Sequence, residues 1–310
     1  MAEKAFKRAS FLGVQIDMAR ERTFQVCGIN IRVHSRHHPA EYERLWAALH
    51  DLGTIFVRGH LGLMIGDRRS VRVRDHDWVV GYFYTFVDID PAQRWLDVES
   101  GREADEDTRH SVRIPANLRP NMTEVPYVLD TENHHLLFIN KERSCSLSAS
   151  NVRKLLKELS SRDEITRQFG TVDLTIMTDT SQLDAMLSWP VIRKLHLTLE
   201  RINPTDYEDD QEVFRRLADL GAKREERTYV KDDDEPTLRV DEPLRRVSRI
   251  AAQNGEVEVH GRDPSGHTGH AKSQKFPLVM KGEYIPARTS LMDALIGFAI
   301  DSFTGRRNMG

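Results

Sequence analysis

Apolar and polar positions alternate over the first ninety residues in a way that predicts strands around one helix. Residues 23–33 are rich in β-branched and aromatic side chains, which predicts a strand. Residues 39–53 place apolar side chains at helical spacing, with a proline at the start and a glycine at the end. Residues 54–66 and 78–89 are predicted to be extended. The expected order is therefore strand, helix, strand, strand.

A long polar connection follows at 97–126. It is acidic at first and then rich in proline, as expected of a functional or mobile loop. Beyond it the pattern predicts five further elements, which are a hairpin at 126–140, a helix at 148–165, a strand at 171–178, a helix at 179–189 and a strand at 192–202. Strands that alternate with helices favour a layered α/β sandwich.

The last third of the chain predicts a mixture of helices and strands. Helices are expected at 210–221, 243–253 and 289–303, and strands at 223–230, at 255–266 and at 276–286, with the last two paired. The fold class expected from the whole pattern is α+β, with mixed, largely antiparallel sheets and packed helices. The predicted organisation is an N-terminal extension at 1–20, a central α/β domain at 21–204 and a smaller C-terminal α+β domain at 205–310.

Composition narrows the class of protein. The chain has 310 residues, of which 30% are charged and 39% hydrophobic, and no apolar run approaches the length of a membrane helix. The first residues are too polar for a secretory signal, and two cysteines cannot build a disulfide framework. We therefore expect a cytoplasmic protein that does not enter a membrane. Because the formal net charge is −3, nucleic-acid binding would need a local basic patch.

The densest basic stretch begins at Arg58 and runs into "GHLGLMIGDRRSVRVRDHDW" at 59–78. Its glycines match neither a phosphate loop nor a dinucleotide fingerprint, since a strand and not a helix follows them. Arg72 and Arg74 are predicted to share one strand face. The candidate phosphate contacts are Arg58, Arg68, Arg69, Arg72 and Arg74. The alternative is a charged sheet edge that prevents edge-to-edge pairing.

Aromatic side chains follow on the next predicted strand. Trp78 and Tyr82 alternate with other residues and fall on one face, together with Tyr84. Such rings could stack on nucleic-acid bases. A place in the core or in a cross-strand aromatic ladder is the more common use of this pattern.

No catalytic signature is present in the sequence. A loop with His260, Asp263, His267 and His270 has nitrogen and oxygen ligands at short spacing for a divalent metal, but its glycines and proline favour a plain turn. Asp88 and Asp90 end a strand as nuclease carboxylates do, yet no Glu-x-Lys follows in a suitable strand. Serine nucleophile elbows, kinase motifs and zinc-protease motifs are missing. We therefore predict no catalytic residues, no bound metal and no cofactor, while leaving enzyme activity open.

Several segments, taken in order, resemble the bacterial family known as domain of unknown function 4747 (DUF4747). The resemblance covers about residues 20–290 and rests on "FQVCGINIRVHS", "PAEYERLW", "YFYTFVDIDPAQRWLDVES", "IPANLRPNMTEVPYVLDTENHHLLF", "SLSASNVRKLLKEL", "GTVDLTIMTDTSQLDAMLSWPVIRKLHLTLERINPTD" and "HGRDPSGHT". That family supplies no catalytic residues to transfer. A fainter likeness links "FVRGHLGLMIG" and "NHHLLFI" to the phage-exclusion protein RexA and to KwaB of the Kiwa system. It implies antiphage defence by abortive infection, DNA binding and self-association.

These observations lead to one expected function and two alternatives. We expect a non-enzymatic bacterial defence protein that binds DNA through its arginines, with Trp78 and Tyr82 as stacking candidates, and that forms a homodimer. The first alternative is a sensor or adaptor that binds a phage or host protein. The second is a metal-dependent nuclease that uses Asp88 or Asp90 together with the loop from His260 to His270.

Overall fold

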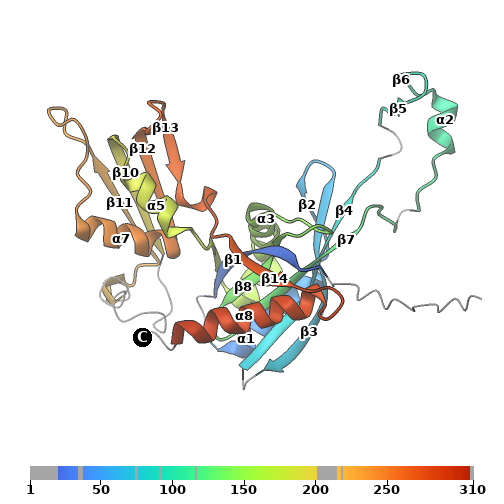
Figure 1. The fold of residues 1–310 in the computed structure, drawn as a ribbon, viewed down its shortest axis with the longest axis horizontal. Coiled ribbons are helices and arrows are strands. Elements are labelled where there is room, and N and C mark those ends of the chain that lie inside the picture. Colours follow the sequence, from blue (N-terminus) through green and yellow to red (C-terminus); the bar gives the residue numbers. More distant parts are fainter. Residues whose placement is uncertain are drawn as a thin grey trace, which may run out of the picture.

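Two antiparallel sheets organise the chain in the computed structural model, which describes residues 20–33, 38–73, 76–90, 93–115, 117–200, 215–217 and 219–307 (Figure 1). The first sheet has the order β14-β1-β8-β7-β4-β3-β2, and β9 also pairs with β1. Its strands are β1 (Arg22–Val33), β2 (Ile55–Arg58), β3 (Leu61–Val73), β4 (His76–Val87), β7 (Thr123–Asp130), β8 (His135–Lys141), β9 (Val172–Ile176) and β14 (Met280–Tyr284).

The second sheet has the order β11-β10-β12-β13. Its strands are β10 (Val191–Glu200), β11 (Arg224–Val230), β12 (Gly255–Arg262) and β13 (Thr268–Lys272), followed by the short helix η1 (Ser273–Lys275). Every pairing among the described strands of both sheets is antiparallel, which confirms the predicted α+β class.

Helices cover both faces of the first sheet. α1 (Pro39–Asp51), α3 (Ala149–Ser160) and α4 (Asp163–Phe169) pack together on one face, and α8 (Leu291–Arg307) packs on β7, β8 and β14 on the other. The apolar face of α1 is set by helical spacing, because Tyr42, Leu45, Trp46 and Leu49 are all buried. The Nε1–H group of Trp46 donates to the hydroxyl oxygen of Tyr127 over 2.8 Å, inside this core.

Two helices cover one face of the second sheet. α5 (Thr180–Leu187) and α7 (Glu242–Gln253) pack against each other, and α7 also contacts β10 and β12. The buried apolar residues of this unit form a cluster separate from that of the first sheet. The described residues therefore form two hydrophobic cores.

The sheets divide the chain at other points than the expected boundary between residues 204 and 205. β10 lies in the second sheet although it precedes that boundary, while β14 and α8 return to the first sheet near the end of the chain. The predicted pairing of 255–266 with 276–286 is wrong, because β12 pairs with β13 and β14 pairs with β1. The cause is long-range strand pairing, which local periodicity cannot reveal.

The glycines of β3 have a packing role. Phe86 and Tyr84 on the neighbouring strand β4 lay their rings over Gly62 and Gly66. A Cβ atom at Gly66 would lie 2.5 Å from the Tyr84 ring, so a larger residue has no room there. Close approach of aromatic rings, and not phosphate binding, accounts for these two glycines.

The connection between β4 and β7 leaves the sheet as an arm, which we define as the described residues of this connection, namely 88–90, 93–115 and 117–122. It holds the short strands β5 (Leu96–Asp97) and β6 (Arg102–Glu103) and the helix α2 (Glu106–Ser111), which buries no residue. Figure 1 shows the arm extending away from both sheets. An ion pair of 2.6 Å between Arg119 and Asp88 joins its two ends. The predicted loop at 97–126 thus contains regular structure, and β7 begins before its expected end.

Both cysteines are placed where thiol chemistry is suppressed. Cys27 lies on β1 and Cys145 follows β8, and both side chains are buried. Burial raises the pKa of each thiol to about 11, so almost no thiolate exists at neutral pH. We expect iodoacetamide to leave both thiols unmodified in the native protein and to alkylate both in denaturant, as measured by intact mass. Rapid alkylation of the native protein would contradict this placement.

Candidate nucleic-acid interface

The outer part of β3 forms an open edge of the first sheet. β2 pairs only with the start of β3, from Leu61 to Leu63, whereas β4 pairs with β3 along its length. Within the described chain, the part of β3 from 64 to 73 therefore has a strand on one side only. Arg68, Arg69 and Arg72 are exposed there, and we call these three residues the arginine edge.

A β-bulge decides which way each arginine points. The register shifts between Ile65 and Arg68, so that Arg68 lies opposite Gly81 and Val71 lies opposite Trp78. Val71 packs against the core of the first sheet, whereas Arg68, Arg69 and Arg72 are all exposed. The alternation places Arg68 and Arg72 on one face of β3 and Arg69 on the other.

Contacts on each face confirm this assignment. The hydroxyl group of Ser70, which lies between Arg68 and Arg72 on their face, donates to the carboxylate of Glu43 on α1. Arg69 lies on the opposite face with Tyr82, where burial raises the pKa of the phenol and the charge of Arg69 acts against that rise. The edge thus presents guanidinium groups to both sides of the sheet.

Contacts from the neighbouring strands β4 and β7 hold the bulge of β3 in place. Gly81 on β4 lies directly against the backbone carbonyl of Asp67, and the hydroxyl group of Tyr127 donates to that same carbonyl over 3.5 Å. Because any side chain at position 81 would meet backbone atoms, only glycine permits this approach. The core contact between Trp46 and Tyr127 is therefore connected to the conformation of the arginine edge.

The electrostatic surroundings of the three arginines differ. Arg72 lies opposite Asp77 on β4. Among the residues that the structure describes, neither Arg68 nor Arg69 forms an ion pair with a carboxylate. These two guanidinium groups are therefore the best placed on the edge to accept an external anion.

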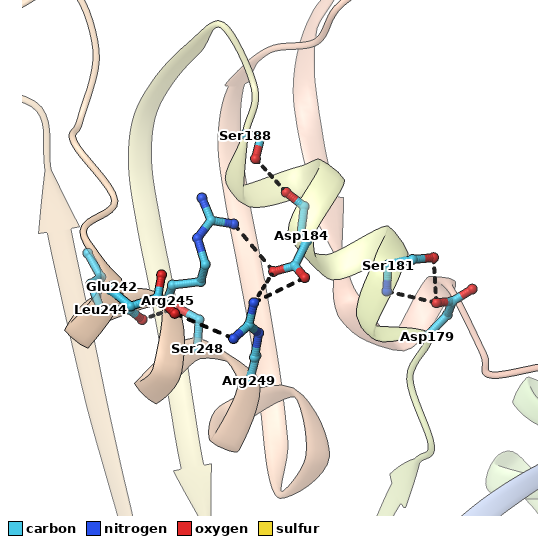
Figure 2. A network of polar contacts seen from close by, with 9 residues as sticks. All are labelled: Asp179, Ser181, Asp184, Ser188, Glu242, Leu244, Arg245, Ser248 and Arg249. Carbon is cyan, nitrogen blue, oxygen red and sulfur yellow. Dashed lines mark hydrogen bonds and ion pairs between the residues drawn. The ribbon is translucent and has the colours of Figure 1, made fainter.

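The arginines of α7 provide a contrast (Figure 2). Arg245 and Arg249 both point at Asp184 on α5, with nitrogen–oxygen distances of 3.3 Å and 3.2 Å. Arg249 also approaches Glu242 at 3.6 Å. Their charges are thus neutralised within the fold, where they join α5 to α7, and we do not include them in the interface.

Two of the predicted phosphate contacts, Arg58 and Arg74, are not part of the arginine edge. Arg58 ends β2 opposite Leu61, at the far end of β3 from the arginine edge, and the structure does not bring it together with the others (Figure 1). Arg74 lies outside the described residues. Of the five arginines expected to form one basic patch, the described structure therefore brings three together on the arginine edge.

The aromatic candidates belong to the core. Trp78 is only 5% exposed, and Tyr82 is half-buried against the same cluster, so burial comes first among the causes that raise its phenol pKa. Their position fits the alternative of a place in the core, and base stacking by these rings stays a prediction. Sequence reasoning missed Phe56, which is 45% exposed and lies two residues before Arg58 on the same side of β2. The sequence carries no signal for this exposure, because Ile55, Phe56 and Val57 are all apolar and only the structure shows which of them is exposed.

The candidate metal ligands form two pairs. His260 and His270 face each other on β12 and β13 with ring centroids 5.5 Å apart, while Asp263 and His267 lie in the turn between these strands. The Nε2 atom of His260 is 2.9 Å from a carboxylate oxygen of Glu258. In the described part of the chain, no group of three or more such side chains is placed to hold a metal ion.

The nuclease carboxylates are not gathered into a cluster either. Asp88 pairs with Arg119 at the base of the arm, and the backbone N–H group of Asp88 donates to the carbonyl of His60. The carbonyl of Asp90 accepts a bond from the backbone of Gln93 in a turn. These contacts of Asp88 and Asp90 stabilise the start of the arm.

Comparison with known proteins finds one family. The family described as "Domain of unknown function (DUF4747)" matches residues 22–300. No curated protein is found to match the chain, so the likeness to RexA and KwaB stays a prediction. Over the residues described, none of the helices combines the length and the apolar character needed to cross a lipid bilayer.

Proposed function

We propose that this chain, which belongs to the DUF4747 family, is a cytoplasmic, non-enzymatic bacterial defence protein that binds nucleic acid through the arginine edge. One observation carries the proposal. Three exposed guanidinium groups project from an open strand edge, and within the described chain Arg68 and Arg69 have no carboxylate partner. Guanidinium groups match phosphate geometry and stay charged at any physiological pH.

The spacing along β3 suits a phosphate backbone. Arg68 and Arg72 are four residues apart on one face, which corresponds to roughly 13 Å along a strand. One strand of a duplex advances about 3.4 Å along the axis per phosphate, so the two side chains span about four phosphates. The contacts read the backbone and not the bases, because the nearby rings of Trp78 and Tyr82 are taken up by the core.

A binding assay with paired variants tests the proposal. We expect Arg68→Glu with Arg69→Glu to weaken binding of a labelled short DNA duplex by roughly 100-fold at low salt, since two phosphate contacts become repulsive. Arg167→Glu with Arg239→Glu is the matched control, because it makes the same charge change at two exposed arginines on other elements. Equal affinity for the two double variants would overturn the assignment. Single-stranded DNA and RNA serve as competitors to establish the preferred nucleic acid.

One observation favours the adaptor alternative. Four of the eight large hydrophobic side chains that are exposed in the described chain lie on the arm, and these are Leu96, Val98, Leu118 and Met122. Exposed apolar side chains on a projecting element are typical of a protein-binding surface. If the protein binds no nucleic acid at low salt, this surface becomes the better candidate. The nuclease alternative is checked in the same assay by adding Mg²⁺ or Mn²⁺, where intact DNA is the expected result.

A further inference from the structure

We propose that the arm of one copy of this chain docks on the arginine edge of a second copy, so that self-association and nucleic-acid binding compete for the same guanidinium groups. This inference rests on the proposed function for its second half only. The docking itself follows from the apolar side chains on the arm, from its charge and from its direction relative to the edge.

The arm presents apolar side chains that its own chain leaves uncovered. Leu96 is 69% exposed and Val98 is 84% exposed, although both lie in a segment with ordered contacts. Two ordered contacts nearby are the bond from Ser100 to Asp97 and the ion pair between Arg94 and Glu103. An ordered segment that holds such side chains in water is expected to bury them against a partner.

Charge identifies the kind of partner. Residues 97–107 contain six acidic side chains, at positions 97, 99, 103, 105, 106 and 107, and one basic side chain at 102. Hydrogen bonds from Ser100 lower the pKa of Asp97, and those from Thr108 lower the pKa of Asp105, so both are ionised at neutral pH. A surface that combines carboxylates with exposed apolar side chains is complementary to a surface that combines guanidinium groups with an apolar side chain. The arginine edge offers both kinds of group on one face, where half-buried Val71 lies next to Arg69.

The direction in which the arm extends means that its docking partner must be a second copy of the chain. The arm leaves the sheet at Asp88, after the end of β4, whereas Arg68 and Arg72 lie opposite Gly81 and Asp77. At about 3.3 Å per residue, the edge lies roughly 20 to 35 Å back along the strand from the start of the arm. Figure 1 shows the arm extending in the opposite sense. A chain therefore cannot lay its arm on its own edge, while two antiparallel copies can exchange arms.

The exchange of arms is complete within a dimer. Each copy offers one arm and one edge, so two copies related by a two-fold axis form two identical contacts and leave neither surface free. In this dimer the carboxylates of the arm occupy the positions that phosphates take on the proposed nucleic-acid ligand. Nucleic acid is thus expected to separate the copies, and the dimer to be the unbound form.

Sedimentation velocity at low ionic strength, without nucleic acid, tests the docking. We expect the wild-type protein to be a dimer, and two variants to be monomers, namely Arg68→Glu with Arg69→Glu, and Glu99→Lys with Glu106→Lys and Asp107→Lys. Mixing these variants should restore a heterodimer, because each reversed surface then meets its complement. The control is Arg167→Glu with Arg239→Glu, which should remain a dimer.

The possible results separate the docking from the proposed function. A monomeric wild-type protein, or a dimer that persists in the lysine variant, would overturn the docking. A dimer that responds to the variants and yet binds no DNA would support the docking and remove the proposed function. As a second measurement, Leu96→Ser with Val98→Ser should weaken the dimer at least tenfold, and far-UV circular dichroism should confirm that the fold is intact.

Discussion

Replacing Gly81 with alanine is expected to lower the free energy of unfolding by about 3 kcal/mol. A Cβ atom there would lie 2.9 Å from the carbonyl carbon of Asp67 and 2.7 Å from the hydroxyl oxygen of Tyr127. The first of these contacts is to backbone, which cannot rotate away, so the bulge of β3 must move. Urea unfolding followed by tryptophan fluorescence measures the loss.

The matched control for this substitution is Gly269→Ala. Gly269 lies on the exposed strand β13, and a Cβ atom there would meet no neighbouring atom within 4 Å. It should change stability little. If both variants lose the same stability, the loss comes from a general cost of replacing glycine in a strand, and the bulge is not held as described. Because the bulge orients the arginine edge, Gly81→Ala is also expected to weaken DNA binding, whereas Gly269→Ala is not.

Replacing Tyr127 with phenylalanine is expected to lower the free energy of unfolding by about 2 kcal/mol. The hydroxyl group of Tyr127 accepts the Nε1–H bond of Trp46 and donates to Asp67. Without it, the Trp46 donor is left buried with no acceptor, which costs its full desolvation penalty. Differential scanning calorimetry measures the change.

Tyr82→Phe is the control for this second substitution. The Tyr82 hydroxyl group has no hydrogen-bond partner among the described residues, so its removal should cost much less. A Tyr127→Phe protein as stable as the wild type would show that the Trp46 contact contributes nothing. The structure would then give no reason to connect the core to the arginine edge.

The sequence predicted local elements well where one face is buried. The helix at 148–165 corresponds to α3 and α4 because its apolar residues repeat at helical spacing, and the hairpin at 126–140 corresponds to β7 and β8. Strand partners could not be predicted, because paired strands such as β1 and β14 lie near opposite ends of the sequence. β13 was missed because its few residues include an exposed glycine and no apolar alternation.

The candidate interface was predictable only in part. The clustering of arginines located the edge, and their alternation with Val71 correctly placed that valine on the other side of the strand from Arg72. The bulge could not be read from the sequence, because it depends on a backbone contact with Gly81 from another strand. The burial of Trp78 likewise depends on how β4 lies between its neighbouring strands, which periodicity alone does not fix.

The most direct test of the central claim is the salt dependence of DNA affinity for the wild type and for Arg68→Ala with Arg69→Ala. Each phosphate contact contributes about 0.9 to the slope of log affinity against log salt concentration. If the arginine edge binds phosphates, the slope for the alanine variant is shallower by about two contacts, or roughly 1.8. Identical slopes for the two proteins would contradict the claim that the arginine edge binds the nucleic-acid backbone.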